Sequence, residues 1–108
     1  MNEKMIEARL RDGVKALGGV AYKWVSPGNA GVPDRMVVLP GGVVHFIELK
    51  REGGKLTRMQ KVQQERLRAR GANCATVYGL SGVKTYLMLA REVVQHGISA
   101  ACLPEILH

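Results

Sequence analysis

Two short apolar segments separated by a proline and two glycines constrain the fold of this chain more than any other feature. Residues 36–39 are all apolar, and residues 43–50 are rich in β-branched and aromatic side chains. Each segment has the length of a strand, and the Pro-Gly-Gly sequence at residues 40–42 is typical of a turn. The pattern therefore predicts an antiparallel β-hairpin.

Three charged residues lie where the open end of this hairpin is expected. Asp34 stands just before the first strand, and Glu48 and Lys50 stand near the end of the second. Side chains alternate along a strand, so Glu48 and Lys50 share one face and Leu49 points to the other. Because the second strand runs back to the level at which the first begins, the hairpin predicts that Asp34, Glu48 and Lys50 converge.

Two carboxylates and a lysine at one point suit hydrolysis of a phosphodiester with the help of a divalent metal. Carboxylate oxygens are hard ligands for Mg²⁺ or Mn²⁺ and leave coordination positions for water and a phosphate. Such a metal activates water and stabilises charge on the phosphate, and a nearby lysine adds positive charge. The expected metal ligands are Asp34, Glu48 and the backbone carbonyl of Leu49. This spacing alone also arises by chance in charged proteins.

Further characteristic segments surround the hairpin in a fixed order. They are residues 5–10, 23–28, 31–35, 39–42, 46–50 and 56–60, and the series extends to about residue 83. In this order they resemble the virus-type replication-repair nuclease (VRR-NUC) domains of the PD-(D/E)xK nuclease superfamily. The family often has a small residue and a proline after the lysine, whereas this chain has Arg51 and Glu52, which concerns only the shape of that loop.

The resemblance implies a fold and a set of site residues. The fold is an α/β restriction-endonuclease-like core, αβββαβ(α), with a mixed central sheet flanked by helices. Asp34 and Glu48 would bind the metal, and Lys50 would be the catalytic lysine. Glu7 would add an acid from the first helix, although the sequence pattern alone favours a solvated helix charge. Gln60 would be the glutamine that follows the core strands.

Periodicity predicts the remaining elements. Helices are expected at residues 2–17, 57–70 and 81–96, and further strands at residues 20–25 and 74–78. Thr57 and Gln60 fit a capping box, so Gln60 has a structural role as an alternative to its place in the site. Arg58, Lys61 and Arg68 share one face of this second helix.

Composition favours a polyanionic partner. The 108 residues include 16 Lys plus Arg against 9 Asp plus Glu, which gives a net charge of +7. Such an excess attracts nucleic acid, although a merely soluble basic protein would show it as well. The glycines of residues 26–31 leave backbone amides free to approach a phosphate. The expected DNA contacts are Lys23, Ser26, Arg35, Lys55, Arg58 and Lys61, with ordinary exposed residues as the alternative reading of Lys23 and Ser26.

The chain has the size of a single domain with one modest core. Residues 1–97 are expected to form the nuclease domain, and the apolar tail at residues 98–108 is expected to pack on the core or on a dimer partner. Two cysteines make neither a zinc site nor a disulfide framework. Neither a leader nor a run of roughly 18 apolar residues is present. We therefore expect a cytoplasmic protein of a prokaryotic or phage-infected cell, with no membrane contact and no small-molecule cofactor.

The leading hypothesis is an Mg²⁺- or Mn²⁺-dependent endodeoxyribonuclease. The resemblance implies cleavage of branched DNA such as Holliday junctions by a homodimer, and a domain without a base-reading module suits recognition of DNA by shape. The alternatives are a non-catalytic DNA-binding module and a sequence-specific restriction-type nuclease. Intact Asp34, Glu48 and Lys50 argue against the non-catalytic module.

Overall fold

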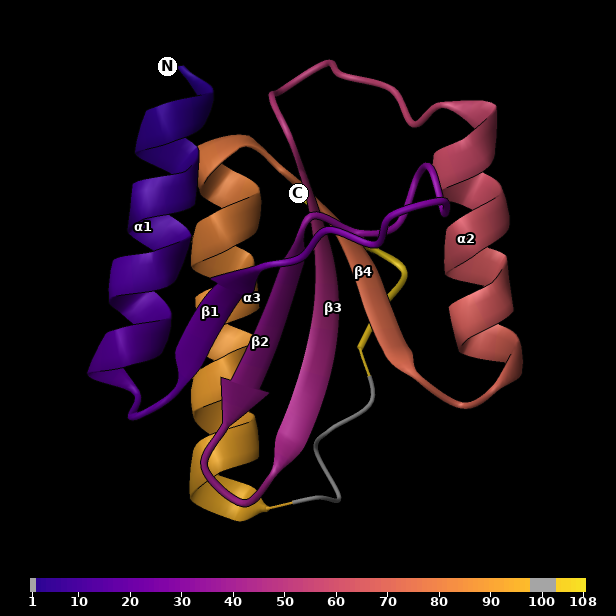
Figure 1. Cartoon of the computed structure of the whole chain (residues 1–108). Coiled ribbons are helices and arrows are strands. Elements are labelled where there is room, and N and C mark those ends of the chain that lie inside the picture. Colours follow the sequence, from indigo (N-terminus) through magenta and orange to yellow (C-terminus); the bar gives the residue numbers. More distant parts are fainter. Residues whose placement is uncertain (1, 98–102) are drawn as a thin grey trace.

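A mixed five-stranded sheet with helices on both faces forms the protein, as the computed structural model shows for residues 2–97 and 103–108 (Figure 1). The elements in chain order are α1 (Glu3–Ala16), β1 (Val20–Lys23), β2 (Arg35–Leu39), β3 (Val43–Lys50), α2 (Arg58–Ala69), β4 (Asn73–Tyr78), α3 (Gly79–His96) and β5 (Ile106–Leu107). Strands β1, β2 and β3 are antiparallel, whereas β4 and β5 add in parallel to β3. The predicted α/β fold with a mixed sheet is confirmed, and β5 is an additional strand.

The two faces of the sheet are covered differently. On one face, α1 and α3 pack side by side and bury the odd-numbered strand residues, among them Val37, Ile47 and Val77. His45 lies on this face, with its Nδ1 atom 2.8 Å from the hydroxyl oxygen of Tyr86, so it is a core residue. On the opposite face, α2 lies beside β4. The helices therefore form two separate layers around the sheet.

The predicted hairpin is confirmed over β2 and β3. Gly41 and Gly42 both have positive φ angles, of 90° and 79°, and the Gly42 N–H donates to the Leu39 carbonyl at 3.0 Å. Glycine adopts these angles at little steric cost. The register continues to Arg35 opposite Ile47, so the ladder stops just before Asp34.

Two boundaries differ from the prediction by two residues, and the others differ by at most one. α3 begins at Gly79 rather than at Ser81, because the positive φ of Gly79 (64°) lets the chain turn from β4 directly into the helix. β1 ends at Lys23 rather than at residue 25, although the Trp24 N–H still donates to the Asp34 carbonyl at 2.8 Å. The chain then leaves the sheet in a turn in which the Ser26 carbonyl accepts the Asn29 N–H at 3.0 Å.

The described part of the tail joins the sheet. β5 pairs with β4, and Leu103 and Leu107 pack against the core. The predicted apolar contacts of Ile98, Ala100 and Ala101 lie outside the described residues. Within residues 2–97 and 103–108, no helix combines the length and apolar character that a membrane span requires.

Candidate active site

A small pocket of about 160 Å³ lies where the C-terminal end of β3 meets the first turns of α1. Its lining includes the three charged residues predicted to converge, together with others from α1 and the end of β3. The lining residues are Glu3, Ile6, Glu7, Asp34, Glu48, Leu49, Lys50 and Arg51.

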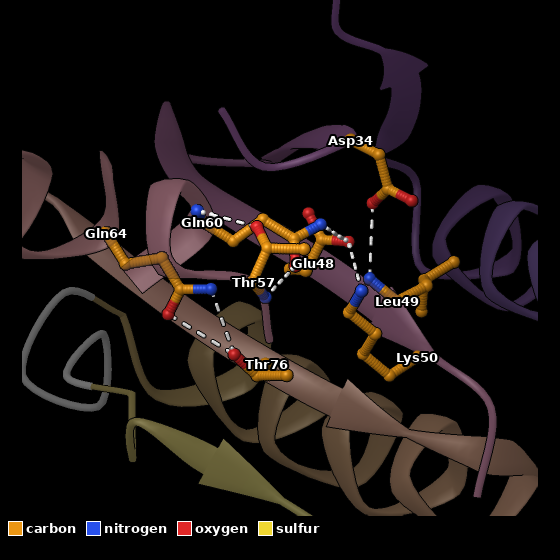
Figure 2. A network of polar contacts seen from close by, with 8 residues as sticks. All are labelled: Asp34, Glu48, Leu49, Lys50, Thr57, Gln60, Gln64 and Thr76. Atoms are coloured by element: carbon orange, nitrogen blue, oxygen red, sulfur yellow. Dashed lines mark hydrogen bonds and ion pairs between the residues drawn. The ribbon is translucent and has the colours of Figure 1, made fainter. Parts of the chain in front are cut away.

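Asp34 lies one residue before β2 and faces the end of β3. The last pair in the register is Arg35 with Ile47. One step further along the same register places Asp34 opposite Glu48. The Asp34 Oδ1 atom accepts the Leu49 N–H at 3.2 Å (Figure 2). Because the N–H and C=O of a strand residue point to the same side, the Leu49 carbonyl is also directed toward this end of the hairpin.

Glu48 is buried, and a hydrogen bond from Gln60 and an ion pair with Lys50 orient it. Its residue is 5% exposed, and its Oε2 atom accepts the Gln60 amide Nε2 at 3.3 Å (Figure 2). The Lys50 Nζ atom lies 3.9 Å from the same oxygen. Glu48 and Lys50 therefore share one face of β3, as alternation along the strand predicts.

Gln60 makes both of the contacts that the sequence left as alternatives. Its Oε1 atom accepts the Thr57 N–H at 2.8 Å, and its own N–H donates to the Thr57 hydroxyl at 3.1 Å, which completes the capping box of α2. Its amide nitrogen is left to donate to Glu48. One side chain thus starts the helix and orients a buried carboxylate.

The Gln60→Glu substitution should separate these two roles. Glutamate keeps the oxygen acceptor that a capping box requires. The helix content of the protein, measured by circular dichroism, should therefore be unchanged. The donor to Glu48 becomes a second carboxylate, and a reaction that depends on Glu48 should slow by about 10- to 100-fold. The control is Gln60→Ala, which removes both the helix cap and the donor to Glu48. It should show the same slower reaction and also lose about 1 kcal/mol of unfolding free energy. A Gln60→Glu variant that reacts at the wild-type rate would show that Gln60 only caps the helix.

Glu7 reaches the pocket with its charge already paired. The Arg35 guanidinium lies 3.0 Å from the Glu7 Oε2 atom, and the Arg35 side chain is only 11% exposed. The ion pair joins α1 to the start of β2. Arg35 is one of the predicted DNA contacts. To contact a phosphate, its guanidinium would have to break the ion pair with Glu7.

Comparison with known proteins identifies the family. No family model matches the sequence. A protein of Acyrthosiphon pisum secondary endosymbiont phage 1, described as "Putative nuclease p44", is 48% identical over 71 residues, which are 66% of this chain and 76% of that protein. A solved structure described as "VRR_NUC domain" is similar with a TM-score of 0.75 and 34% identity, over 80% of this chain and 94% of that one. This chain belongs to the VRR-NUC family. The resemblance found in the sequence is confirmed.

Two carboxyl groups of the VRR-NUC pocket, those of Asp34 and Glu48, are perturbed by their surroundings. Burial raises the pKa of Asp34, against the opposing effect of the Leu49 N–H. Burial, and then the negative charge of Asp34, raise the pKa of Glu48 from 4.5 to about 7, although the Lys50 ammonium acts in the opposite direction. Two partly desolvated carboxylates that repel each other favour a bound cation.

The donor set of this VRR-NUC pocket fits a divalent metal of the Mg²⁺ type. Within residues 2–97 and 103–108, no cluster of three or more His, Cys, Asp or Glu side chains forms a metal site. Mg²⁺ commonly takes only one or two carboxylates and keeps several waters. Asp34 and Glu48 would supply two oxygen ligands, and the Leu49 carbonyl would supply a third.

Exposed cations lie on β1 and at the start of α2, the helix whose Gln60 contacts Glu48. Lys55, Arg58 and Lys61 are exposed just before and within the first turn of α2, and Lys23 is exposed at the end of β1. The N-terminus of α2 carries a partial positive charge, which adds to the positive electrostatic potential of these cations. These four residues are available to a phosphate backbone.

Two other polar side chains serve the fold instead. The Ser26 hydroxyl accepts the Asn29 side-chain amide at 3.0 Å and thereby closes its own turn. Arg68 does not lie on the exposed basic face predicted for it, because it turns inward and donates to Gln64 at 2.8 Å and to the Cys74 carbonyl at 3.2 Å.

Two glutamines that the sequence did not single out hold α2 in place. Gln63 donates to the Ala30 carbonyl at 3.2 Å. Gln64 donates to the Thr76 hydroxyl at 3.0 Å, as Figure 2 shows. They are the buried residues of α2. Together with Gln60 they follow an i, i+3, i+4 spacing, which places all three on one helix face. That spacing is the signal that could have revealed them.

Gly31 brings the loop before Asp34 against the first turn of α2. Its φ is +88°, and a Cβ atom there would lie 2.6 Å from the Met59 carbonyl carbon. The close approach is thus to the protein's own helix and not to a phosphate. Gly28 has a similar φ of +80° with nothing within 4 Å of a Cβ atom, and it stays free to approach a substrate.

Gly31→Ala should therefore be more damaging than Gly28→Ala. Both changes place alanine at a positive φ, which costs roughly 1–2 kcal/mol. Gly31→Ala must also move the loop off α2, so we expect an additional loss of about 1–3 kcal/mol and weaker cleavage through displacement of Asp34. Urea unfolding of the two variants measures the difference. Equal losses would show that the contact with Met59 is easily relaxed.

Proposed function

We propose that this VRR-NUC domain is a Mg²⁺- or Mn²⁺-dependent endonuclease that hydrolyses phosphodiester bonds in DNA, with a preference for branched DNA such as Holliday junctions. One observation carries the proposal. Asp34 and Glu48 face each other at the open end of the hairpin, with the Lys50 ammonium 3.9 Å from Glu48. A buried carboxylate pair beside a lysine suits metal-assisted hydrolysis and has no evident use in a surface that only binds phosphates.

The residues of the pocket would divide the work. Asp34, Glu48 and the Leu49 carbonyl would hold the metal, which when bound would supply an activated water and charge stabilisation at the phosphate. The Lys50 ammonium would stabilise negative charge that develops as water attacks phosphorus and the bond to the leaving oxygen breaks. Gln60 would keep Glu48 in its orientation through the amide hydrogen bond.

DNA is the proposed substrate because exposed cations lie at the end of β1 and at the start of α2, two elements that adjoin the hairpin. Lys23, Lys55, Arg58 and Lys61 would contact backbone phosphates and provide affinity without sequence specificity. Ser26 would contribute through the loop that it closes, and Arg35 would act mainly by holding Glu7. A domain of this size would then select DNA by its shape.

We further propose that the domain acts as a homodimer in the cytoplasm of a prokaryotic or phage-infected cell. Resolution of a four-way junction needs two symmetric incisions. A two-fold dimer supplies two identical active sites in that relation.

A panel of labelled DNAs tests the proposal. Linear duplex, flapped duplex and four-way junction would each be incubated with the protein in Mg²⁺, in Mn²⁺ and in EDTA. We expect cleavage with either metal, none in EDTA, and faster cleavage of the junction than of the linear duplex. Lys50→Met should bind junction DNA as the wild type does while its cleavage rate falls by roughly 1,000-fold, since several kcal/mol of charge stabilisation are lost.

Each alternative gives a different result. A sequence-specific restriction-type enzyme would cut the linear duplex at one site in preference to the junction. A non-catalytic module would bind DNA and leave every substrate intact in both metals. Lys50→Met cleaving at the wild-type rate would remove the lysine from the chemistry.

A further inference from the structure

One face of the three antiparallel strands carries a continuous set of apolar side chains that no helix of the described residues covers. These side chains form two rows that cross the strands in register. The rows are Val20–Val38–Val44 and Tyr22–Met36–Phe46. We call these six residues the open apolar face. Tyr22 is 60% exposed and Val20 is 44% exposed, and the other four are half-buried.

The alternation of side chains explains why this face is separate from the core. Odd-numbered residues of β2 and β3 point to the layer of α1 and α3, so even-numbered residues point away from it. In Figure 1, α3 lies behind β1 and β2, and among the described residues no helix lies in front of β1, β2 or β3. The sheet of most small domains buries both faces or keeps the second face polar. Here the second face is neither buried nor polar.

Trp24 extends the open apolar face beyond Phe46. Its ring lies 5.1 Å from that of Phe46, at an interplanar angle of 45°. Trp24 is the single tryptophan of the chain. Any partner that covers the face therefore changes the surroundings of the only indole.

We infer that a second copy of this chain covers the open apolar face, so that the dimer forms sheet against sheet. This inference rests on the homodimer in the proposed function and names its interface. Sheets pack face to face when both inner faces are apolar. Under two-fold symmetry the partner automatically presents the same apolar, identically twisted face.

Charge argues against DNA as the occupant. None of the six side chains is Lys or Arg, and affinity for a phosphate backbone depends on such cations. Lys23 is adjacent to Tyr22 in sequence, but alternation directs it to the other side of β1. The exposed cations near the pocket lie instead at the start of α2.

The extent of the face fits an interface core. Strand and residue spacings give the rows together with Trp24 a footprint on the order of 300 Å², which is the size at which apolar patches on soluble proteins mark binding sites. A stable dimer buries about 800 Å² per partner, so a polar rim must surround this core. Val25, which follows Trp24 and is 70% exposed, belongs to that rim.

The tail, which the sequence allows to pack on a dimer partner, is used within the chain where the structure describes it, and so are apolar residues of α3. Leu103 and Leu107 pack on the protomer's own core, as do Leu87 and Val94 of α3. Among the described residues, the open apolar face thus remains as a continuous apolar surface that a partner would cover. Such a dimer leaves both pockets accessible, because each pocket lies at the end of β3 beside α1.

Sedimentation of the wild type and two matched variants tests the inference. Tyr22→Lys places a charge on the open apolar face at an already exposed position, and Met88→Lys makes the same kind of change on α3, where Met88 is 71% exposed. We expect the wild type and Met88→Lys to be dimers at micromolar concentration. Tyr22→Lys should raise the dimer dissociation constant at least about tenfold, since a buried aromatic anchor is lost. Dilution of the wild type should shift Trp24 emission to longer wavelength in parallel with the loss of mass.

The outcomes separate this inference from the proposed nuclease activity. A wild type that is monomeric throughout, a Tyr22→Lys variant that dimerises normally, or a Met88→Lys variant that dissociates would each overturn the inference. If the wild type is monomeric and the Tyr22→Lys substitution lowers its affinity for DNA, the open apolar face stacks nucleobases instead of a second copy. A monomeric wild type that still cleaves DNA would leave the endonuclease standing, whereas a dimer sensitive to Tyr22→Lys that cleaves nothing would support the interface and refute the activity.

Discussion

Asp34→Asn should lower DNA cleavage by at least roughly 1,000-fold while DNA binding stays equal or becomes tighter. Asparagine keeps an oxygen to accept the Leu49 N–H, which Asp34 accepts at 3.2 Å, so the end of the hairpin should keep its shape. One negative charge is lost, and with it a hard metal ligand that contributes to several kcal/mol of catalysis. Removal of a like charge beside phosphate favours binding.

Single-turnover cleavage in Mg²⁺ and fluorescence anisotropy in EDTA measure the two effects separately. Asp12→Asn is the matched control, because Asp12 is exposed on α1 and contacts only the neighbouring Arg11, at 3.7 Å, among the ion pairs found. It should cleave at the wild-type rate. If Asp34→Asn also kept full cleavage, the assignment of Asp34 as a metal ligand would be wrong.

The second large effect concerns stability in the absence of metal. The folded protein holds a proton on Glu48 up to a pKa of about 7, whereas an unperturbed glutamate releases it near 4.5. Between these values the folded state binds more protons than the unfolded state, so stability is full at low pH and falls as pH rises. The total loss for this group is on the order of 3 kcal/mol. Asp34, whose pKa is also raised, contributes in the same direction.

Urea unfolding in EDTA from pH 5 to pH 8 measures this dependence. Glu48→Gln cannot ionise, so it should lose most of the slope and be more stable than the wild type at pH 8. Mg²⁺ should restore stability to the wild type at pH 8 and should do so less for Glu48→Gln. Glu65→Gln, at an exposed position of α2, should behave as the wild type. Wild-type stability that rises steadily over this range would contradict the raised pKa.

The hairpin and its charged end could be predicted from sequence because they depend on short-range rules. The turn at residues 40–42 sets the register, and the register brings Asp34 opposite Glu48. The capping box of Gln60 is equally local. The pairing of Glu7 with Arg35 depends on how α1 docks on the strands, which no local pattern encodes.

The inner face of α2 could not be predicted for a different reason. Periodicity identifies a buried helix face by its apolar residues, whereas α2 buries Gln63 and Gln64. Polar residues on a helix are usually read as solvent-facing, so these two gave no signal of burial. The start of α3 at Gly79 was missed because a positive φ within a strand-to-helix junction leaves no trace except the glycine itself.

The polar attachment of α2 should make the helix that orients Glu48 a separately melting unit. Hydrogen bonds such as those of Gln63 and Gln64 contribute about 1 kcal/mol each, far less than the apolar burial that holds α1 and α3. Segments held in this way open well below the free energy of global unfolding. Amide hydrogens of α2 should therefore exchange with solvent before those of α3. Each such opening breaks the hydrogen bond through which the Gln60 side-chain amide orients Glu48. The fraction of molecules with Glu48 correctly oriented would therefore depend on the opening equilibrium of α2, the weakest-held helix, rather than on the rigidity of the sheet.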